Sequence, residues 1–217
     1  LFLSSLAAQG PAGLDAPATE ADAPAPRSTY GRAKRAAERA LLDSGLDVAI
    51  LRPPAVYGPG DPRLRPLFRA ARRGWLPEVG GGATSLVHVE DLSEACRAVI
   101  EQSSFGGRIY LVDDGAPVPR AQLLREIGWA VCGREVRLVP IPSFVLGCAA
   151  ALSEAKARTL GPATAFTRDK VRDLLAPGWV CSSARIRREL GWAPLVERRR
   201  GLEDCARWAL GASVEGA

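Results

Sequence analysis

Short apolar runs alternate with amphipathic segments along the first two thirds of the chain. Runs at residues 47–51, 84–89 and 108–112 have the length of buried strands. The segments between them carry apolar residues every three or four positions, which is the spacing of one helix face. This spacing predicts helices at residues 29–44, 63–73, 91–102 and 120–132. The alternation predicts an α/β fold in which helices cover both faces of a parallel or mixed sheet.

Two stretches lack a helix or strand pattern. Residues 6–28 are rich in Ala, Pro and Gly and predict a long loop. Residues 53–62 (PPAVYGPGDP) contain too many prolines and glycines for regular structure. The three glycines at 80–82 follow no predicted strand and open no predicted helix, so we interpret them as a turn.

The pattern changes beyond residue 134. One more strand is predicted at residues 136–141, and the segments after it are mostly helical: 143–160, 167–175, 183–190 and 201–210. We therefore divide the chain into residues 1–134 and a mostly helical cap of residues 135–217. No apolar run approaches the roughly 20 residues that span a membrane, so we expect no transmembrane helix.

Composition narrows the classes of function. The chain has 29 basic and 24 acidic residues, and nearly all of the basic residues are arginine. No aromatic residues interleave with the arginine clusters, so we expect no nucleic-acid partner. One histidine and five cysteines without a CxxC pair argue against a metal site, and the scattered thiols indicate the cytoplasm. The chain begins at Leu1 and contains no methionine, so we expect a piece of a longer protein.

The sharpest local signal is the sequence Tyr30-Gly31-Arg32-Ala33-Lys34. In a helix, positions i and i+4 share one face, so the phenol and the ammonium group point the same way. Free tyrosine has a pKa near ~10, and a neighbouring cation lowers the pKa because it favours the phenolate. The pair therefore predicts a proton-transfer device.

Two further segments are expected at the same edge of the sheet. Ser4 and Ser5 follow the first apolar run, and RPPAVYGPGD follows the run at 47–51. Open α/β sheets place ligand-binding side chains at such strand ends. In these segments and in STYGRAKRAAE, SLVHVEDLSEA and the closing RRELGWAP and GLEDCARWAL, the chain resembles the extended short-chain dehydrogenase/reductase family.

The resemblance covers essentially the whole chain and implies a fold. It implies the C-terminal part of a Rossmann-like, doubly wound parallel sheet with a small, mostly helical substrate-binding lobe. Residues 1–134 would be the second half of the Rossmann-like domain with interleaved substrate loops. Residues 135–217 would be the substrate-binding cap.

The resemblance also implies roles for individual residues. Ser5, with Ser4 as the fallback, would hydrogen-bond the substrate oxygen, and Tyr30 would transfer the proton. Lys34 would lower the pKa of Tyr30 and hold the nicotinamide ribose of NAD or NADP. The nicotinamide ring would be bordered by Pro54, Ala55 and Val56. Further candidates for contact with substrate are Tyr57 and Arg63.

Two features depart from the family pattern. The N-terminal strand, the Gly-rich phosphate turn and the acidic ribose ligand are missing from the sequence, so NAD is not distinguished from NADP. We accordingly expect residues 1–217 alone to bind a nicotinamide cofactor weakly and to be inactive. Ser5 is followed by Leu-Ala-Ala, where the 4,6-dehydratases of the family carry Thr-Asp-Glu, so we do not expect dehydratase chemistry.

The predicted function is an NAD(P)-dependent oxidoreductase that interconverts a secondary alcohol and a ketone, similar to the 3-beta-hydroxysteroid dehydrogenase branch. Two alternatives stay open: an NAD-dependent sugar-nucleotide epimerase, and a non-catalytic cofactor-binding structural protein of the same fold. The expected partner is a small molecule, either a sterol-like or other lipophilic alcohol or ketone, or a nucleotide sugar. A homodimer is also left open.

Overall fold

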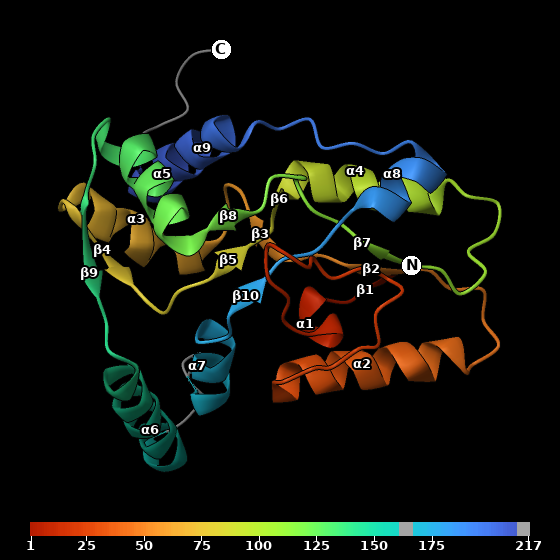
Figure 1. The fold of residues 1–217 in the computed structure, drawn as a ribbon, viewed down its shortest axis with the longest axis horizontal. Helices are drawn as coiled ribbons and strands as arrows, with labels where there is room; N and C mark the ends of the chain where they lie inside the picture. Colours follow the sequence, from red (N-terminus) through yellow and green to blue (C-terminus); the bar gives the residue numbers. More distant parts are fainter. Residues whose placement is uncertain (161–166, 212–217) are drawn as a thin grey trace.

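A parallel sheet of three strands lies among helices in the N-terminal part of the chain (Figure 1). The strands pair in the order β1 (Phe2–Leu3), β2 (Ile50–Arg52) and β7 (Ile109–Leu111). One face is covered by α1 (Leu6–Gln9) and α2 (Thr29–Leu42), and the other by α4 (Val89–Ile100) and α8 (Ala184–Leu190). The computed structural model describes residues 1–160 and 167–211. Its architecture confirms the predicted Rossmann-like α/β fold.

Three smaller sheets extend from this centre. The first two are parallel pairs, β3 (Ala55–Tyr57) with β6 (Leu86–His88) and β4 (Trp75–Glu78) with β9 (Arg137–Pro140). The third has the order β10 (Gly178–Trp179), β5 (Ala83–Thr84) and β8 (Val118–Pro119). The remaining helices are η1 (Pro62–Leu64), α3 (Arg65–Arg72), α5 (Arg120–Cys132), α6 (Ser143–Leu160), α7 (Arg168–Leu174) and α9 (Arg198–Leu210).

Two large hydrophobic clusters stabilise the fold. One joins the central sheet to α4 and α8 and contains Leu51, Val99 and Ile186. The other joins α3, α5 and α9 and contains Phe68 and Ile127. The C-terminal segments thus pack back on the earlier part of the chain, because α8 belongs to the first cluster, α9 to the second, and β10 pairs with β5.

Several local predictions were wrong. The segment at 53–62 contains β3, because the residues after the two prolines are extended and pair with β6. The predicted loop at 6–28 contains α1, for which the hydroxyl of Ser5 accepts the Ala7 N–H as an N-cap. The run at 84–89 divides at the buried Ser85 into β5 and β6, which belong to different sheets.

In residues 1–160 and 167–211, no helix is long and apolar enough to cross a membrane.

A glycine allows α2 to approach α1 closely. Gly31, the second residue of the Tyr-Gly-Arg-Ala-Lys motif, is buried where α2 packs against α1. A Cβ atom at this position would lie 2.3 Å from the carbonyl oxygen of Ala7. Any larger residue must therefore move α2 away from α1.

We predict that Gly31→Ala lowers the free energy of unfolding by about 1–3 kcal/mol, because the added methyl group overpacks this contact. The matched control is Gly147→Ala in α6, where a Cβ atom meets nothing within 4 Å. Alanine is the better helix former, so the control should be neutral or stabilising by up to about 1 kcal/mol. Urea unfolding measures both. Equal effects of the two substitutions would contradict the close approach.

Candidate functional site

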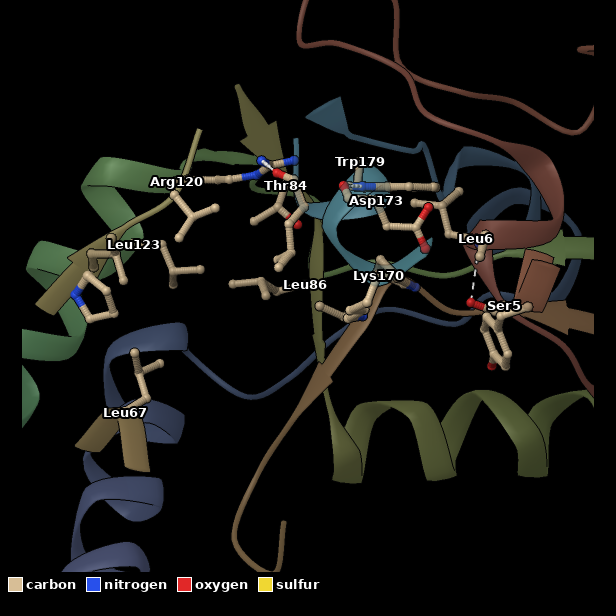
Figure 2. A pocket seen from close by; sticks show the side chains of 18 residues that line it. Ser5, Leu6, Leu67, Thr84, Leu86, Arg120, Leu123, Lys170, Asp173 and Trp179 are labelled. Atoms are coloured by element: carbon tan, nitrogen blue, oxygen red, sulfur yellow. Dashed lines mark hydrogen bonds between the residues drawn. The ribbon is translucent and has the colours of Figure 1, made fainter. Parts of the chain in front are cut away.

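Ser5 and Tyr30 line one cavity of about 520 Å³, together with Pro54 and Ala55 (Figure 2). Ser5 follows β1, and Tyr30 lies in the first turn of α2. The oxygen of the Ser5 hydroxyl accepts the Ala7 N–H at 3.2 Å, so its own proton stays available to a ligand. Four of the residues expected at the site are thus brought together by the fold.

Lys34 lies one helical turn after Tyr30, as its spacing predicts. Its Nζ is 6.0 Å from the centre of the Tyr30 ring and 5.0 Å from the centre of the Phe2 ring. It donates a hydrogen bond to the carbonyl oxygen of Leu3 at 3.0 Å. An ammonium group has three donors, so this bond fixes the side chain and leaves capacity for a second acceptor.

The other predicted residues lie elsewhere. Val56 packs against the cluster under α4, and Tyr57 is buried edge-on against His88, with ring centres 5.2 Å apart. Burial raises the pKa of Tyr57 far above its usual range. Arg63 is exposed and forms an ion pair with Asp61. Neither Tyr57 nor Arg63 lines the cavity that holds Ser5 and Tyr30.

Ser4 belongs to a buried polar network that the sequence analysis did not find. Its hydroxyl donates to Glu38 at 2.6 Å, and Arg52 donates to the same carboxylate through Nε at 2.8 Å and Nη2 at 2.6 Å. Arg35 donates to Glu38 at 3.0 Å, and Arg52 also donates to the side chain of Gln9. The network joins the end of β1 to α1, α2 and β2.

Glu38 and Arg52 are almost completely buried, at 0% and 1% exposure. Burial raises the pKa of Glu38, but the hydrogen bonds from Arg52 and Ser4 outweigh it and hold the pKa below its usual range. Two sequence features point to the pair: Glu38 lies seven residues after Gly31, on the same helix face, and Arg52 ends an apolar strand. A buried arginine requires an acidic partner.

The N-terminus of α2 is capped from two directions. The Ser28 hydroxyl accepts the Gly31 N–H at 3.1 Å, and Asp169 of α7 accepts the Thr29 N–H at 2.6 Å. Negative charge is favourable at a helix N-terminus. Through Asp169, the C-terminal part of the chain therefore contacts the turn that carries Tyr30.

The residues present fit the nicotinamide half of a dinucleotide site. Tyr30 is 54% exposed at one side of the cavity, Pro54 and Ala55 form a wall beside it, and Lys34 retains donors for a ribose hydroxyl. In the described part of the chain, no Gly-rich turn between a strand and a helix is present to hold the pyrophosphate. The arrangement can transfer a proton to or from an oxygen bound between Ser5 and Tyr30.

The sequence of this chain is similar to those of several known proteins. The model of the "NAD dependent epimerase/dehydratase family" matches residues 1–112. The chain is 27% identical over 223 aligned positions to UDP-glucose 4-epimerase of Vibrio cholerae, covering 98% of this chain and 63% of the relative. It is 33% identical over 162 positions to ceramide reductase of Caulobacter vibrioides, covering 72% of this chain and 50% of the relative.

A solved structure extends the similarity to the fold. RMD from Pseudomonas aeruginosa, complexed with NADPH, superposes with a TM-score of 0.70 at 19% identity, covering 97% of this chain and 65% of that chain. This chain spans half to two thirds of the length of these three proteins.

We predict that Arg52→Met lowers the free energy of unfolding by about 3–5 kcal/mol, because it leaves the Glu38 carboxylate buried without its main partner. The control is Arg97→Met, which removes two solvent-exposed ion pairs and should change stability little. Urea unfolding at neutral pH compares the two. If Arg52→Met were no worse than Arg97→Met, the buried pair would not organise the site.

The pair of Glu38 and Arg52 also makes the free energy of unfolding depend on pH in the acidic range. Because the folded pKa of Glu38 is lowered, its stabilisation is fully present above the unfolded pKa of about 4.3 and is lost as the pH falls through the folded pKa. Glu38→Gln should therefore show a smaller loss of stability on acidification than the unsubstituted chain. An unchanged pH profile would contradict the lowered pKa.

Proposed function

Because the chain belongs to the NAD dependent epimerase/dehydratase family, we propose that it forms the catalytic part of an NAD(P)-dependent oxidoreductase that interconverts a secondary alcohol and a ketone. The observation that carries the proposal is that the hydroxyl groups of Ser5 and Tyr30 border one cavity while Lys34 lies one turn after Tyr30. These three groups are what acid–base chemistry at an alcohol oxygen requires.

Tyr30 is the proton donor and acceptor. In the direction of reduction, its hydroxyl gives a proton to the substrate oxygen as that oxygen gains negative charge, and in oxidation the phenolate takes the proton back. The Lys34 ammonium group lies 6.0 Å from the centre of the ring and places a positive charge one helical turn from the reacting group. The bond from Lys34 to Leu3 keeps that charge in place.

Ser5 positions the substrate oxygen. Its own oxygen accepts the Ala7 N–H, which leaves the hydroxyl proton free to donate to a carbonyl. A preorganised donor of this kind stabilises the charge that develops on the oxygen. Ser4 is not suited to the role, because it is 5% exposed and its proton goes to Glu38.

The proposed cofactor is NAD or NADP, and when bound it supplies or accepts the hydride. Pro54 and Ala55 line the cavity beside Tyr30, and they would border the nicotinamide ring together with the backbone of Val56. Lys34 would hold the nicotinamide ribose through its remaining donors. The chain therefore binds and orients the reacting end of the cofactor.

A sugar-nucleotide epimerase remains the second candidate, since V. cholerae UDP-glucose 4-epimerase is a relative over nearly the whole chain. An epimerase uses the same acid–base residues but produces no net reduced cofactor. The third candidate, a structural protein that binds the cofactor without turnover, is not favoured, because Ser5, Tyr30 and Lys34 are all present.

We predict that Tyr30→Phe lowers turnover at least about a hundredfold in the active protein that contains this chain, because it removes the transferable proton. The assay follows reduced nicotinamide with a panel of lipophilic secondary alcohols and with UDP-glucose. Net cofactor reduction indicates a dehydrogenase, whereas isomerised sugar without net reduction indicates an epimerase. Lys34→Ala should impair both turnover and cofactor affinity.

The matched control is Tyr110→Phe, which removes a hydroxyl that donates to Glu189 and does not line the cavity. Its turnover should be unchanged. Near-normal turnover of Tyr30→Phe would overturn the assignment of Tyr30.

Ser5 and Ser4 are expected to respond oppositely to alanine substitution. Ser5→Ala should lower kcat about a hundredfold, because it removes the donor to the substrate oxygen. Ser4→Ala should keep kcat within a few fold but lower the free energy of unfolding by about 1–3 kcal/mol, because Glu38 loses a buried hydrogen bond. Steady-state kinetics and urea unfolding separate the two effects. A larger loss of kcat in Ser4→Ala would reverse the assignment.

A further inference from the structure

The cavity at Ser5 and Tyr30 is lined mostly by apolar side chains. They come from elements far apart in the sequence. Examples are Leu6 of α1, Leu67 of α3, Val79 after β4, Leu86 of β6, Leu123 of α5 and Leu174 of α7. The cavity continues from Ser5 past Leu86 to Leu123 and Leu67 (Figure 2). A volume of about 520 Å³ lies within the range of roughly 300–1,000 Å³ that accepts drug-sized ligands.

Two cations, Arg120 and Lys170, line the cavity. Arg120 donates to the carbonyl oxygens of Leu174 and, at 2.9 Å, of Ala176, which fixes the C-terminal end of α7. Burial lowers the pKa of Arg120. Lys170 interacts with the charge of Asp173, three residues along the same helix. The cavity lining described by the structure therefore offers no pair of uncommitted cations to a diphosphate, which binds best to several charged donors.

Asp173 is the carboxylate in this apolar lining. Its Oδ1 is buried and, in the described part of the chain, has no hydrogen-bond partner. Burial raises the pKa of Asp173, while the Ser28 hydroxyl and the Lys170 charge act in the opposite direction. A carboxylate has about four acceptor positions, so most of its capacity is unused.

The position of Asp173 is fixed from both sides. The Trp179 indole N–H donates to its backbone carbonyl at 2.8 Å, and Asp169, one turn earlier, accepts the Thr29 N–H. In Figure 2, the Asp173 carboxylate points toward the side of the cavity that holds Ser5. A ligand oxygen at Ser5 and Tyr30 would thus leave Asp173 to contact another polar group of the same ligand.

We propose that the cavity binds a lipophilic molecule with a hydrogen-bond donor, a hydroxyl or an ammonium group, that is bound by Asp173, and that it does not bind a nucleotide sugar. The apolar walls bind the body of the ligand, and Asp173 selects its polar group. This inference adds a substrate class to the proposed oxidoreductase. The reaction of that substrate rests on the proposed function, whereas the binding does not.

The test uses three probes of equal chain length and different head group: decylamine, decanol and decanoate. Binding to the protein is measured by calorimetry at neutral pH. We expect decylamine to bind at least about tenfold more tightly than decanoate, with decanol between them, because a donor satisfies Asp173 and an anion is repelled by it. UDP-glucose should not displace decylamine.

Two variants test whether Asp173 causes the preference for decylamine over decanoate. Asp173→Asn keeps the shape but offers an amide donor, so the ratio of decylamine to decanoate affinity should fall at least about tenfold. The control Asp43→Asn removes the same charge at an exposed position after α2, outside the cavity lining, and should leave the ratio unchanged. Circular dichroism checks that each variant is folded.

The outcomes separate this inference from the proposed function. Equal binding of decylamine and decanoate by the unsubstituted protein would overturn the role of Asp173, even if the variants did not fold. Displacement of decylamine by UDP-glucose would overturn the lipophilic class. If the head-group preference held while Tyr30→Phe kept full turnover, the binding inference would stand and the proposed reaction would fail.

Discussion

The buried ion pair between Glu38 and Arg52 determines how the candidate site is assembled. Glu38 lies on α2, two turns after Tyr30, and Arg52 ends β2, the strand that pairs with β1. Breaking this buried pair would cost about 3–5 kcal/mol of folding free energy, so α2 and β2 are held in fixed positions relative to each other. Ser4 and Gln9 attach β1 and α1 to the same pair. Ser5 and Tyr30 take no part in this network, but they lie on the elements that it joins.

Much of the apolar lining of the cavity comes from later parts of the chain. Leu123 comes from α5, Leu174 from α7 and Trp179 from β10, whereas Ser5 and Tyr30 come from the first thirty residues. The two sets meet because β10 pairs with β5 and because Asp169 caps α2. The cavity lining is thus assembled from segments far apart in the sequence.

Local sequence patterns predicted most of the helices and strands, but they did not predict contacts between residues far apart in the sequence. The bounds of α5 and α6 agree with the predicted ranges, because helical periodicity and the residues at the ends are local features. The i+4 spacing likewise placed Tyr30 and Lys34 on one face. In contrast, β3 was not predicted because prolines precede it and its pairing with β6 is long-range. Asp173 was not found either, since only the tertiary fold brings it beside an apolar cavity.

The account is tested most directly by a crystal structure of the protein with NADP or NAD and a lipophilic ketone. It predicts that the nicotinamide ring lies against Pro54 and Ala55, with the ketone oxygen about 2.6–3.2 Å from the hydroxyl oxygens of both Ser5 and Tyr30. The reacting carbon should face the nicotinamide at about 3–3.5 Å. A ketone oxygen bound away from Tyr30, or a nicotinamide on another face of the molecule, would contradict it.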